Sequence, residues 1–220
     1  MSERRAAIEE FEELPQSSEW KLWKFEHTKR PIKVLKLLHQ NGQHEPTTAT
    51  HGYVFSVLID SNPYALKMFK FFDVETDKDE LIPLDKDMVS DDEYESQRDP
   101  FYAECRAYGC IYSKKRRNTA LVVRCFGFIS VPARMEKTLT ERFNVEKWNR
   151  PEHEYDLRPE DRSPFRALVK TLVTRNDPLS QVRLRKMRDD VDELRRIGVF
   201  PMDVSLRNFV GGRLVDFGSS

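Results

Sequence analysis

Three polar residues near the end of the printed sequence have the types and the spacing that phosphoryl transfer requires. Asp203 is followed by Asn208, and Asp216 comes after a Gly-Gly turn. In this chemistry an Asp lies beside the attacking hydroxyl, an Asn a few residues further on reaches a metal, and another Asp bridges metal and phosphates. A simpler interpretation also exists, because Asp and Asn favour turns and loops for their own hydrogen bonds.

Two charged residues further upstream extend this set. Lys67 ends the segment Tyr-Ala-Leu-Lys in a predicted strand, and Glu104 lies in a predicted helix over residues 101–111. Either residue alone is an ordinary surface charge. Together with the three polar residues near the end of the chain, they form an ordered set on suitable elements.

This ordered set resembles the nucleotide-binding part of a eukaryotic protein kinase, ending at the element Asp-Phe-Gly of residues 216–218. The resemblance implies that Lys67 holds the phosphates and that Glu104 orients Lys67. It also implies that Asp203 accepts the substrate hydroxyl proton and that Asn208 and Asp216 bind metal, with ATP and Mg²⁺ as the cofactors.

The same resemblance extends to the start of the predicted hairpin. Gly52-Tyr53-Val54 is similar to the end of a glycine-rich loop, with Val54 over the adenine. Thr47 and Ala49 occupy the other glycine positions, so we expect a weaker grip on phosphates, since side chains keep backbone N–H groups away from them.

Two segments carry a narrower similarity to fungal kinase-like proteins that are grouped with a kinetochore-subunit family. They are residues 163–170, Ser-Pro-Phe-Arg-Ala-Leu-Val-Lys, and residues 208–217, Asn-Phe-Val-Gly-Gly-Arg-Leu-Val-Asp-Phe. For some members the similarity implies a nuclear, chromatin-associated role.

The sequence departs from the kinase pattern in ways that bear on activity. Pro201 and Met202 stand where kinases usually have His and Arg, and Ser205 replaces the Lys that usually neutralises the transferring phosphoryl group. Two residues follow Gly218, so we expect no activation segment and no helices for a substrate platform. Two hypotheses stay open: a nucleotide-binding protein with little or no phosphoryl transfer, and an inactive pseudokinase scaffold or protein-interaction module.

The elements that must position these residues follow from apolar spacing and turn residues. Residues 53–59 and 64–71 are rich in β-branched and aromatic types and flank a turn at 60–63, which predicts an antiparallel hairpin. Apolar residues three and four apart predict one continuous helix over 180–197, with Pro178 just inside its first turn and Gly198 at its end. Further predictions are a strand or helix start at 32–38, a helix at 6–14, strands at 121–131 and 165–173, and a small hairpin around Gly211-Gly212.

These elements predict an α+β fold with a largely antiparallel N-terminal sheet. The resemblance implies that this fold is protein-kinase-like, with an antiparallel N-lobe sheet and a reduced, mainly helical C-lobe. The predicted organisation has an N-terminal extension at 1–30, an N-lobe at 31–173 and a partial C-lobe at 174–220. Within the N-lobe, residues 73–99 are acidic with few apolar anchors, so we expect weak or irregular order there. Residues 132–164 contain Pro, Trp and charges and are interpreted as irregular.

The amino-acid composition bears on which other classes of partner, such as nucleic acid or a membrane, we expect for this protein. Lys and Arg together number 37, as do Asp and Glu, so the zero net charge does not suggest nucleic acid or an anionic membrane as a partner. No apolar stretch approaches the roughly 20 residues of a membrane helix. Three cysteines with no zinc spacing, and no secretory signal, indicate reduced thiols. We therefore expect a soluble cytoplasmic or nuclear protein whose partners are a nucleotide and other proteins.

Overall fold

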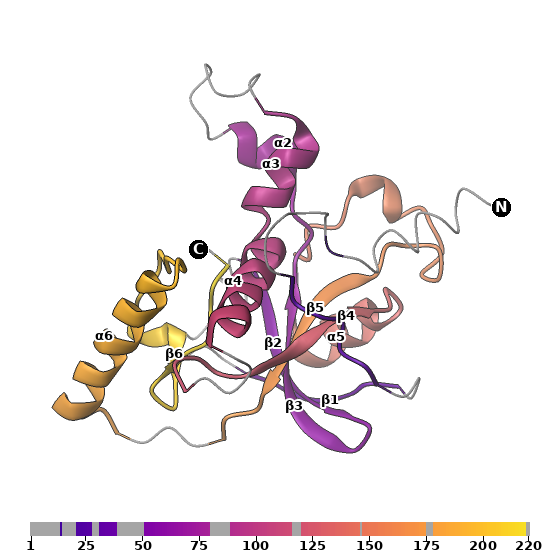
Figure 1. Cartoon of the computed structure of the whole chain (residues 1–220). Coiled ribbons are helices and arrows are strands. Elements are labelled where there is room, and N and C mark those ends of the chain that lie inside the picture. Colours follow the sequence, from indigo (N-terminus) through magenta and orange to yellow (C-terminus); the bar gives the residue numbers. More distant parts are fainter. Residues whose placement is uncertain are drawn as a thin grey trace.

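The computed structural model describes residues 14, 21–27, 31–38, 51–79, 89–115, 120–145, 147–174 and 178–218. These residues form a mixed structure in which helices lie on both sides of a five-stranded antiparallel sheet (Figure 1). The strands are β1 (Lys33–Leu37), β2 (Gly52–Ile59), β3 (Asn62–Phe69), β4 (Cys125–Val131), β5 (Phe165–Thr171), β6 (Phe209–Val210) and β7 (Arg213–Leu214). The helices are α2 (Val74–Asp79), α3 (Asp91–Arg98), α4 (Pro100–Lys115), α5 (Met135–Phe143) and α6 (Gln181–Arg196), with 3-10 turns η2 (Glu152–Glu154) and η3 (Leu206–Asn208).

The predicted hairpin is confirmed as β2 and β3. The two turn residues Asp60 and Ser61 both have positive φ, at 48° and 67°, which suits a two-residue turn whose twist matches the flanking strands. The register sets Val54 opposite Lys67. The segment 32–38, left open between strand and helix, contains the edge strand β1.

The sheet order β1-β2-β3-β5-β4 places β5 between the strand that carries Lys67 and the edge strand β4. One face of the sheet contributes to a core that also contains residues of α4, α6 and Phe217, whereas the other face contributes to a core that contains residues of α5 and Trp148. The mixed α+β class and the antiparallel sheet are therefore as the sequence predicts. The kinase-like lobes and the proposed domain bounds stay predictions.

The long helix predicted over 180–197 is confirmed as α6. Its N-cap is Ser180, whose hydroxyl accepts a hydrogen bond from the backbone N–H of Arg183 at 3.2 Å. Pro178 lies before this cap, so its predicted place inside the first turn is wrong. Gly198 follows the helix with φ +89°, a left-handed conformation that glycine adopts without steric cost.

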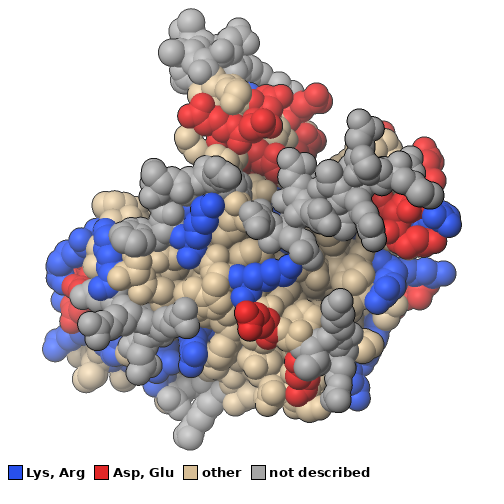
Figure 2. Space-filling model, turned by 45° about the vertical axis from the view of Figure 1, so that its right-hand side comes forward, with Lys and Arg blue, Asp and Glu red and all other residues tan. Residues whose placement is uncertain are grey.

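The expectation of irregular structure at 73–99 is wrong at both ends of that segment. Asp73 and Ser90 cap α2 and α3 through their side chains. Tyr94 is 6% exposed and donates a hydrogen bond to a carboxylate oxygen of Asp77 at 2.7 Å, which ties the two helices together. Local caps and one aromatic anchor therefore supply the order that composition did not indicate, and residues 80–88 lie outside the described part. Figure 2 shows the acidic side chains of α2 and α3 gathered on a projection.

The interpretation of 132–164 as irregular is also wrong. It contains α5, whose Leu139 is fully buried in the core beneath the sheet, and it contains η2. Trp148 is 2% exposed, and its ring centroid lies 4.6 Å from that of Phe165 in β5. These contacts span many residues of sequence, so local composition did not reveal them.

The strand predicted at 121–131 begins later, at Cys125, and Val122 forms only an isolated bridge to Leu214. Part of the predicted N-terminal extension covers β4, because Phe25 donates its backbone N–H to the Phe128 carbonyl oxygen at 2.8 Å. Gly127 has φ +137°, and a Cβ there would lie 2.6 Å from the Trp23 carbonyl oxygen, so this close approach requires glycine. The helix predicted over 6–14 falls outside the described residues except for Leu14. No helix in the described part is long and apolar enough to cross a membrane.

Candidate functional site

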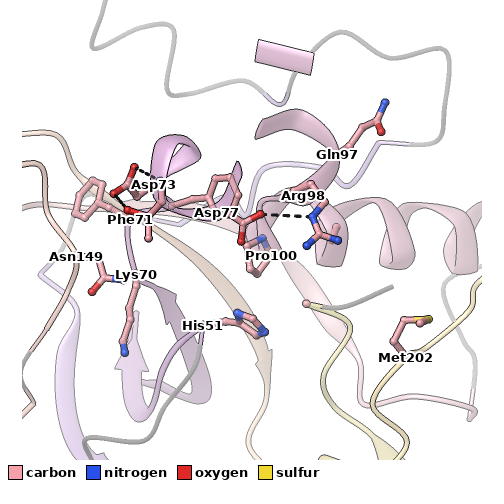
Figure 3. Close-up of a pocket in the computed structure, with 14 residues that line it drawn as sticks. His51, Lys70, Phe71, Asp73, Asp77, Gln97, Arg98, Pro100, Asn149 and Met202 are labelled. Atoms are coloured by element: carbon pink, nitrogen blue, oxygen red, sulfur yellow. Dashed lines mark hydrogen bonds and ion pairs between the residues drawn. The ribbon is translucent and has the colours of Figure 1, made fainter. Parts of the chain in front are cut away.

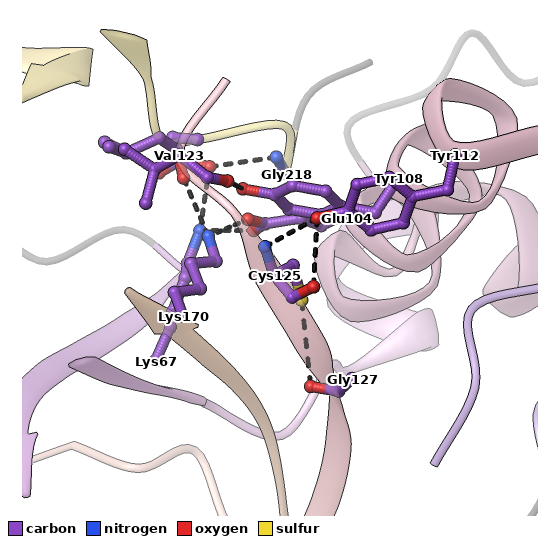
Figure 4. A network of polar contacts seen from close by, with 11 residues as sticks. Lys67, Glu104, Tyr108, Tyr112, Val123, Cys125, Gly127, Lys170 and Gly218 are labelled. Atoms are coloured by element: carbon purple, nitrogen blue, oxygen red, sulfur yellow. Dashed lines mark hydrogen bonds and ion pairs between the residues drawn. The ribbon is translucent and has the colours of Figure 1, made fainter. Parts of the chain in front are cut away.

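Three of the residues singled out from sequence meet in one buried network (Figure 4). The ammonium of Lys67 on β3 lies 2.7 Å from Glu104 Oε2 on α4 and 2.7 Å from Asp216 Oδ1 after β7. The side chain of Glu104 is fully buried and that of Lys67 is 5% exposed. The structure therefore brings together strand, helix and C-terminal segment at the position that the sequence predicts.

A second lysine, which sequence reasoning missed, completes the network. Lys170 on β5 donates to Glu104 Oε1 and, at 2.7 Å, to the Val215 carbonyl oxygen. The sequence contained an indication of this role, because Lys170 stands within an apolar predicted strand. If such a strand is buried, its lysine must find a partner. Two ammonium groups and two carboxylates thus form a set that is neutral as a whole.

Aromatic packing holds the C-terminal segment in this position. The Phe217 ring is 1% exposed and meets the Tyr108 ring of α4 edge to face, with centroids 5.3 Å apart. Tyr108 in turn donates its hydroxyl to the Val123 carbonyl oxygen at 3.0 Å. Because Phe217 is anchored on α4, its neighbour Asp216 faces Lys67, and the Gly218 N–H donates to Asp216 Oδ1 at 2.9 Å.

The network favours the charged forms of two of its members, Asp216 and Lys67. Burial raises the pKa of Asp216, but the ammonium groups of Lys67 and Lys170 and the Gly218 N–H outweigh it, so this pKa lies well below its ordinary range. Burial likewise lowers the pKa of Lys67, and the carboxylates of Asp216 and Glu104 reverse this, so that pKa lies above its usual value.

The other two predicted site residues form a separate unit. Asp203 is about half exposed, and its carboxylate oxygen lies 2.6 Å from an Arg207 guanidinium nitrogen. That hydrogen bond lowers the pKa of Asp203. The buried Asn208 donates its side-chain amide to the Asp203 carbonyl oxygen at 3.0 Å. Within the described residues, no hydrogen bond or ion pair joins Asp203 to Asp216.

Gly52 and Val54 have structural reasons for their positions. A Cβ on Gly52 would lie 2.1 Å from the Met68 carbonyl oxygen of β3, so the close approach of the two strands requires glycine. Val54 is half-buried in β2 beside Lys67. The glycine-rich loop to which they were likened falls largely on residues 39–50, outside the described part.

A cavity of about 640 Å³, whose lining residues are drawn in Figure 3, lies next to the network rather than on it. His51 and Gly218 line it, whereas Lys67, Glu104 and Asp216 do not. Its wall carries both charge signs, and Asp77 and Arg98 pair with each other there at 3.5 Å. Its other lining residues are Lys70, Phe71, Phe72, Asp73, Thr76, Gln97, Pro100, Ala103, Asn149 and Met202.

The two residues to which the kinase resemblance assigns a metal have protein partners in this structure. Asp216 is engaged by an ammonium group, and the Asn208 amide group is turned to the Asp203 backbone. Among the described residues, no group of three or more His, Cys, Asp or Glu side chains could hold a metal. The three cysteines are free thiols, as the sequence predicts.

The depressed pKa of Asp216 predicts how stability depends on pH. A carboxylate whose folded pKa lies below its unfolded value of about 3.9 stabilises the fold above that value, and the contribution is lost as pH falls through the folded pKa. We expect Asp216→Asn to lower the free energy of unfolding at pH 6 and to match the wild type more closely near pH 2.

Urea unfolding at several pH values from about 2 to about 6 measures this difference, because that interval spans the pKa of a carboxylate in the unfolded chain. The matched control is Asp189→Asn, because Asp189 is exposed and, within the described residues, forms an ion pair with its neighbour Arg188 alone. Parallel curves for Asp216→Asn and wild type would contradict the expected titration.

The family model described as kinetochore Sim4 complex subunit FTA2 matches residues 11–220. Neither a curated protein nor a solved structure matches the chain.

Proposed function

Because the chain belongs to the FTA2 family of kinetochore Sim4 complex subunits, we propose that it is a protein-interaction subunit of the kinetochore that does not transfer phosphate. The observation that carries this proposal is the closure of the candidate site on itself. Lys67 and Lys170 bind Glu104, Lys67 also binds Asp216, and Asp203 binds Arg207. Each group that would act on a substrate is already held by a neighbour.

The distribution of exposed apolar side chains supports an interaction role. Of the ten large hydrophobic residues that are exposed in the described part, seven fall between residues 179 and 206. Their concentration in one stretch of the chain makes this stretch a candidate interaction surface, since contiguous exposed apolar patches mark such surfaces. A kinetochore subunit works with other proteins in the nucleus, so we expect protein partners and nuclear localisation.

A tagged full-length chain tests this proposal in its own organism, by fluorescence imaging beside a kinetochore marker. We expect foci at kinetochores, and we expect Asp203→Asn to leave both the foci and chromosome segregation unchanged. Asp203 is half-exposed, so the change does not threaten the fold. Absence of wild-type foci would refute the proposal, and loss of function in a stable, localised Asp203→Asn protein would instead indicate catalysis.

One observation favours a second function, nucleotide binding. Lys67, Glu104 and Asp216 converge on one point, as the sequence resemblance implies for a phosphate-holding lysine. Thermal unfolding with and without ATP, with Mg²⁺ either present or replaced by EDTA, separates the two functions. A ligand at one hundred times its dissociation constant adds about 2.7 kcal/mol to stability. The interaction-subunit proposal predicts no such shift, whereas a shift that Asp216→Ala abolishes and Lys67→Ala weakens would establish the second function.

A further inference from the structure

The cavity beside the ionic network is large enough to hold a ligand. Its volume of about 640 Å³ lies within the range of about 300–1,000 Å³ that is usual for small-molecule sites. Asp73 in its wall accepts a hydrogen bond from the Thr76 hydroxyl at 2.6 Å as it caps α2. Asp77 accepts one from the Tyr94 hydroxyl at 2.7 Å and pairs with Arg98. The carboxylates of the wall are thus already engaged by the protein itself.

Two lysines of like charge lie near each other at a different side of this cavity. Lys70 lines the cavity, and its ammonium lies 5.4 Å from the centre of the Tyr53 ring. Burial and the ammonium of Lys147 both lower the pKa of Lys70, so the two side chains are close enough to repel each other. In Figure 3 the ammonium of Lys70 lies away from the carboxylates of Asp73 and Asp77. This side of the cavity therefore carries positive charge.

The turn that carries Lys147 has a strained backbone. Lys147 and Asn149 both have left-handed conformations, with φ of 59° and 56°. Trp148 between them is buried, and its carbonyl oxygen accepts a hydrogen bond from the Phe71 N–H at 2.9 Å. Asparagine adopts the left-handed conformation readily, but lysine rarely does. Packing of Trp148 explains the turn but not the lysine, because asparagine or glycine would form the same turn with less strain.

Two unfavourable features therefore coincide at one place. They are a lysine in a left-handed conformation and two ammonium groups that repel each other. Lys147 and Asn149 are both exposed, and Asn149 lines the cavity together with Lys70. Strained conformations cluster at active sites and ligand-binding sites, where they are part of the function. An anion beside these groups would offset the repulsion between the two lysines.

We propose that the cavity binds a phosphate monoester, whose oxygens would contact Lys70, Lys147 and Asn149. A phosphate carries about 1.5 to 2 negative charges and has three acceptor oxygens, so it can offset both ammonium groups and accept from the asparagine amide. Phe72 and Pro100 line the same cavity and would contact the group that carries the phosphate. This inference rests on the protein-interaction function proposed above for the source of the phosphate, which is a phosphorylated side chain of a partner protein.

Two other ligands fit this place less well. A carboxylate has a single negative charge and would leave one of the two ammonium groups without compensation. The nucleotide that the kinase resemblance implies would place its phosphates on Lys67. That lysine is paired with Glu104 and Asp216 and does not line the cavity. The proposed phosphate site is therefore separate from the position that the resemblance implies.

Phenyl phosphate is the first probe, because it carries a phosphate monoester on an apolar ring. Benzoate carries a carboxylate on the same ring, and inorganic phosphate lacks the ring. NMR titration of the full chain in EDTA measures the dissociation constants and reports which backbone amides shift. We expect phenyl phosphate to bind most tightly and to shift Lys70, Asn149 and Gly218, which all line the cavity. Equal binding of benzoate, binding only when Mg²⁺ replaces EDTA, or shifts confined to other residues would overturn the proposal.

Lys147→Asn separates lost binding from lost folding. It should weaken the binding of phenyl phosphate by about tenfold or more, because it removes one of two charged donors. Thermal stability should stay level or rise, since asparagine tolerates the left-handed backbone and the repulsion of Lys70 is gone. Unchanged binding by Lys147→Asn would contradict the proposed site.

Lys70→Met removes the other charge and keeps most of the apolar stem of the side chain. It should also weaken binding by about tenfold or more. The matched control is Lys137→Met, which removes the same charge from a side chain that is 84% exposed on α5. Equal effects of these two methionine substitutions would mean that net charge, rather than the cavity, attracts the phosphate, and would overturn the proposal.

Short peptides identify the source of the phosphate. Peptides with one phosphotyrosine or one phosphoserine, and their unphosphorylated forms, are compared with adenosine monophosphate in the same titration. We expect a phosphopeptide to bind more tightly than adenosine monophosphate and its unphosphorylated form to bind much more weakly. Tighter binding of adenosine monophosphate than of either phosphopeptide would overturn the partner protein as the source and assign the cavity to a small phosphorylated molecule.

Imaging distinguishes failure of this site from failure of the proposed function. We expect Lys147→Asn, but not Lys137→Met, to reduce kinetochore foci. Foci that persist unchanged in Lys147→Asn would refute a partner's phosphate in this cavity and leave the interaction function standing. Absence of foci in the wild type would refute the interaction function itself.

Discussion

Glu104→Gln is expected to lower the free energy of unfolding by about 3–5 kcal/mol at pH 7, as the removal of one partner from a buried ionic group does. Glu104 is fully buried and is the shared carboxylate of Lys67 and Lys170. Its replacement removes the negative charge that both lysines share, so that Asp216 becomes the one remaining carboxylate of the network described here. Glutamine has nearly the same shape, so the loss measures charge rather than a cavity.

Denaturant unfolding monitored by circular dichroism measures this loss. Glu141→Gln on α5 is the matched control, because the Glu141 side chain is 65% exposed and pairs loosely with Lys137. That control should change stability by less than about 0.5 kcal/mol, as surface substitutions usually do. A comparably small effect of Glu104→Gln would contradict a charged, paired carboxylate at this position.

The double variant Glu104→Gln/Lys170→Met tests whether the uncompensated charge of Lys170 causes the loss of stability in Glu104→Gln. Methionine is apolar and long enough to fill much of the space of the buried lysine, so the double variant should be more stable than Glu104→Gln alone. Additive losses from the two single changes would show that Glu104 and Lys170 do not depend on each other. The coupling would explain why this protein has a Lys170 that the kinase resemblance did not include.

Sequence patterns predicted those parts of the site that rest on strong local elements. The hairpin that carries Lys67 and the helix that carries Glu104 both have clear apolar periodicity, so their side chains could be placed before the structure was known. Asp216 was assigned from the resemblance of residues 216–218 to the Asp-Phe-Gly element, and the structure adds that Phe217 anchors this segment on α4. Lys170 was missed because a lysine at a strand position is usually solvated, and only the packing of α4 over β5 makes it buried.

In the rest of the fold as well, local sequence predicted some elements, whereas others depend on contacts with residues far away in the sequence. Helix α6 could be predicted from its spacing, but which of its turns are covered depends on the rest of the chain, and Val182 is left exposed. Helices α2 and α3 depend on side-chain caps at Asp73 and Ser90, which composition averages hide. Helix α5 depends on a core built from β1, β2 and β5, whose residues lie far away in the sequence.

The segment that sequence patterns described least well contains another buried ionic centre. The Arg150 side chain is fully buried, and its guanidinium lies 2.8 Å from Glu136 of α5 and also pairs with Glu154 of η2. It donates to the Ser163 carbonyl oxygen at 2.9 Å and lies over the rings of Phe71 and Phe165. One arginine thus connects α5, η2 and the start of β5.

Arg150→Met is therefore expected to cost about 3–5 kcal/mol of unfolding free energy, since it leaves the buried Glu154 without its cation. Methionine keeps apolar contact with the two rings, so the loss again reports charge. Arg158→Met is the matched control, because that arginine is 72% exposed and its ion pairs with Glu160 and Asp161 are worth about 0–1 kcal/mol. Adding Glu154→Gln to Arg150→Met should recover part of the loss. Equal effects of the two arginine substitutions would mean that α5 and η2 are held by apolar packing, with Leu139 and Trp148 as the residues to examine next.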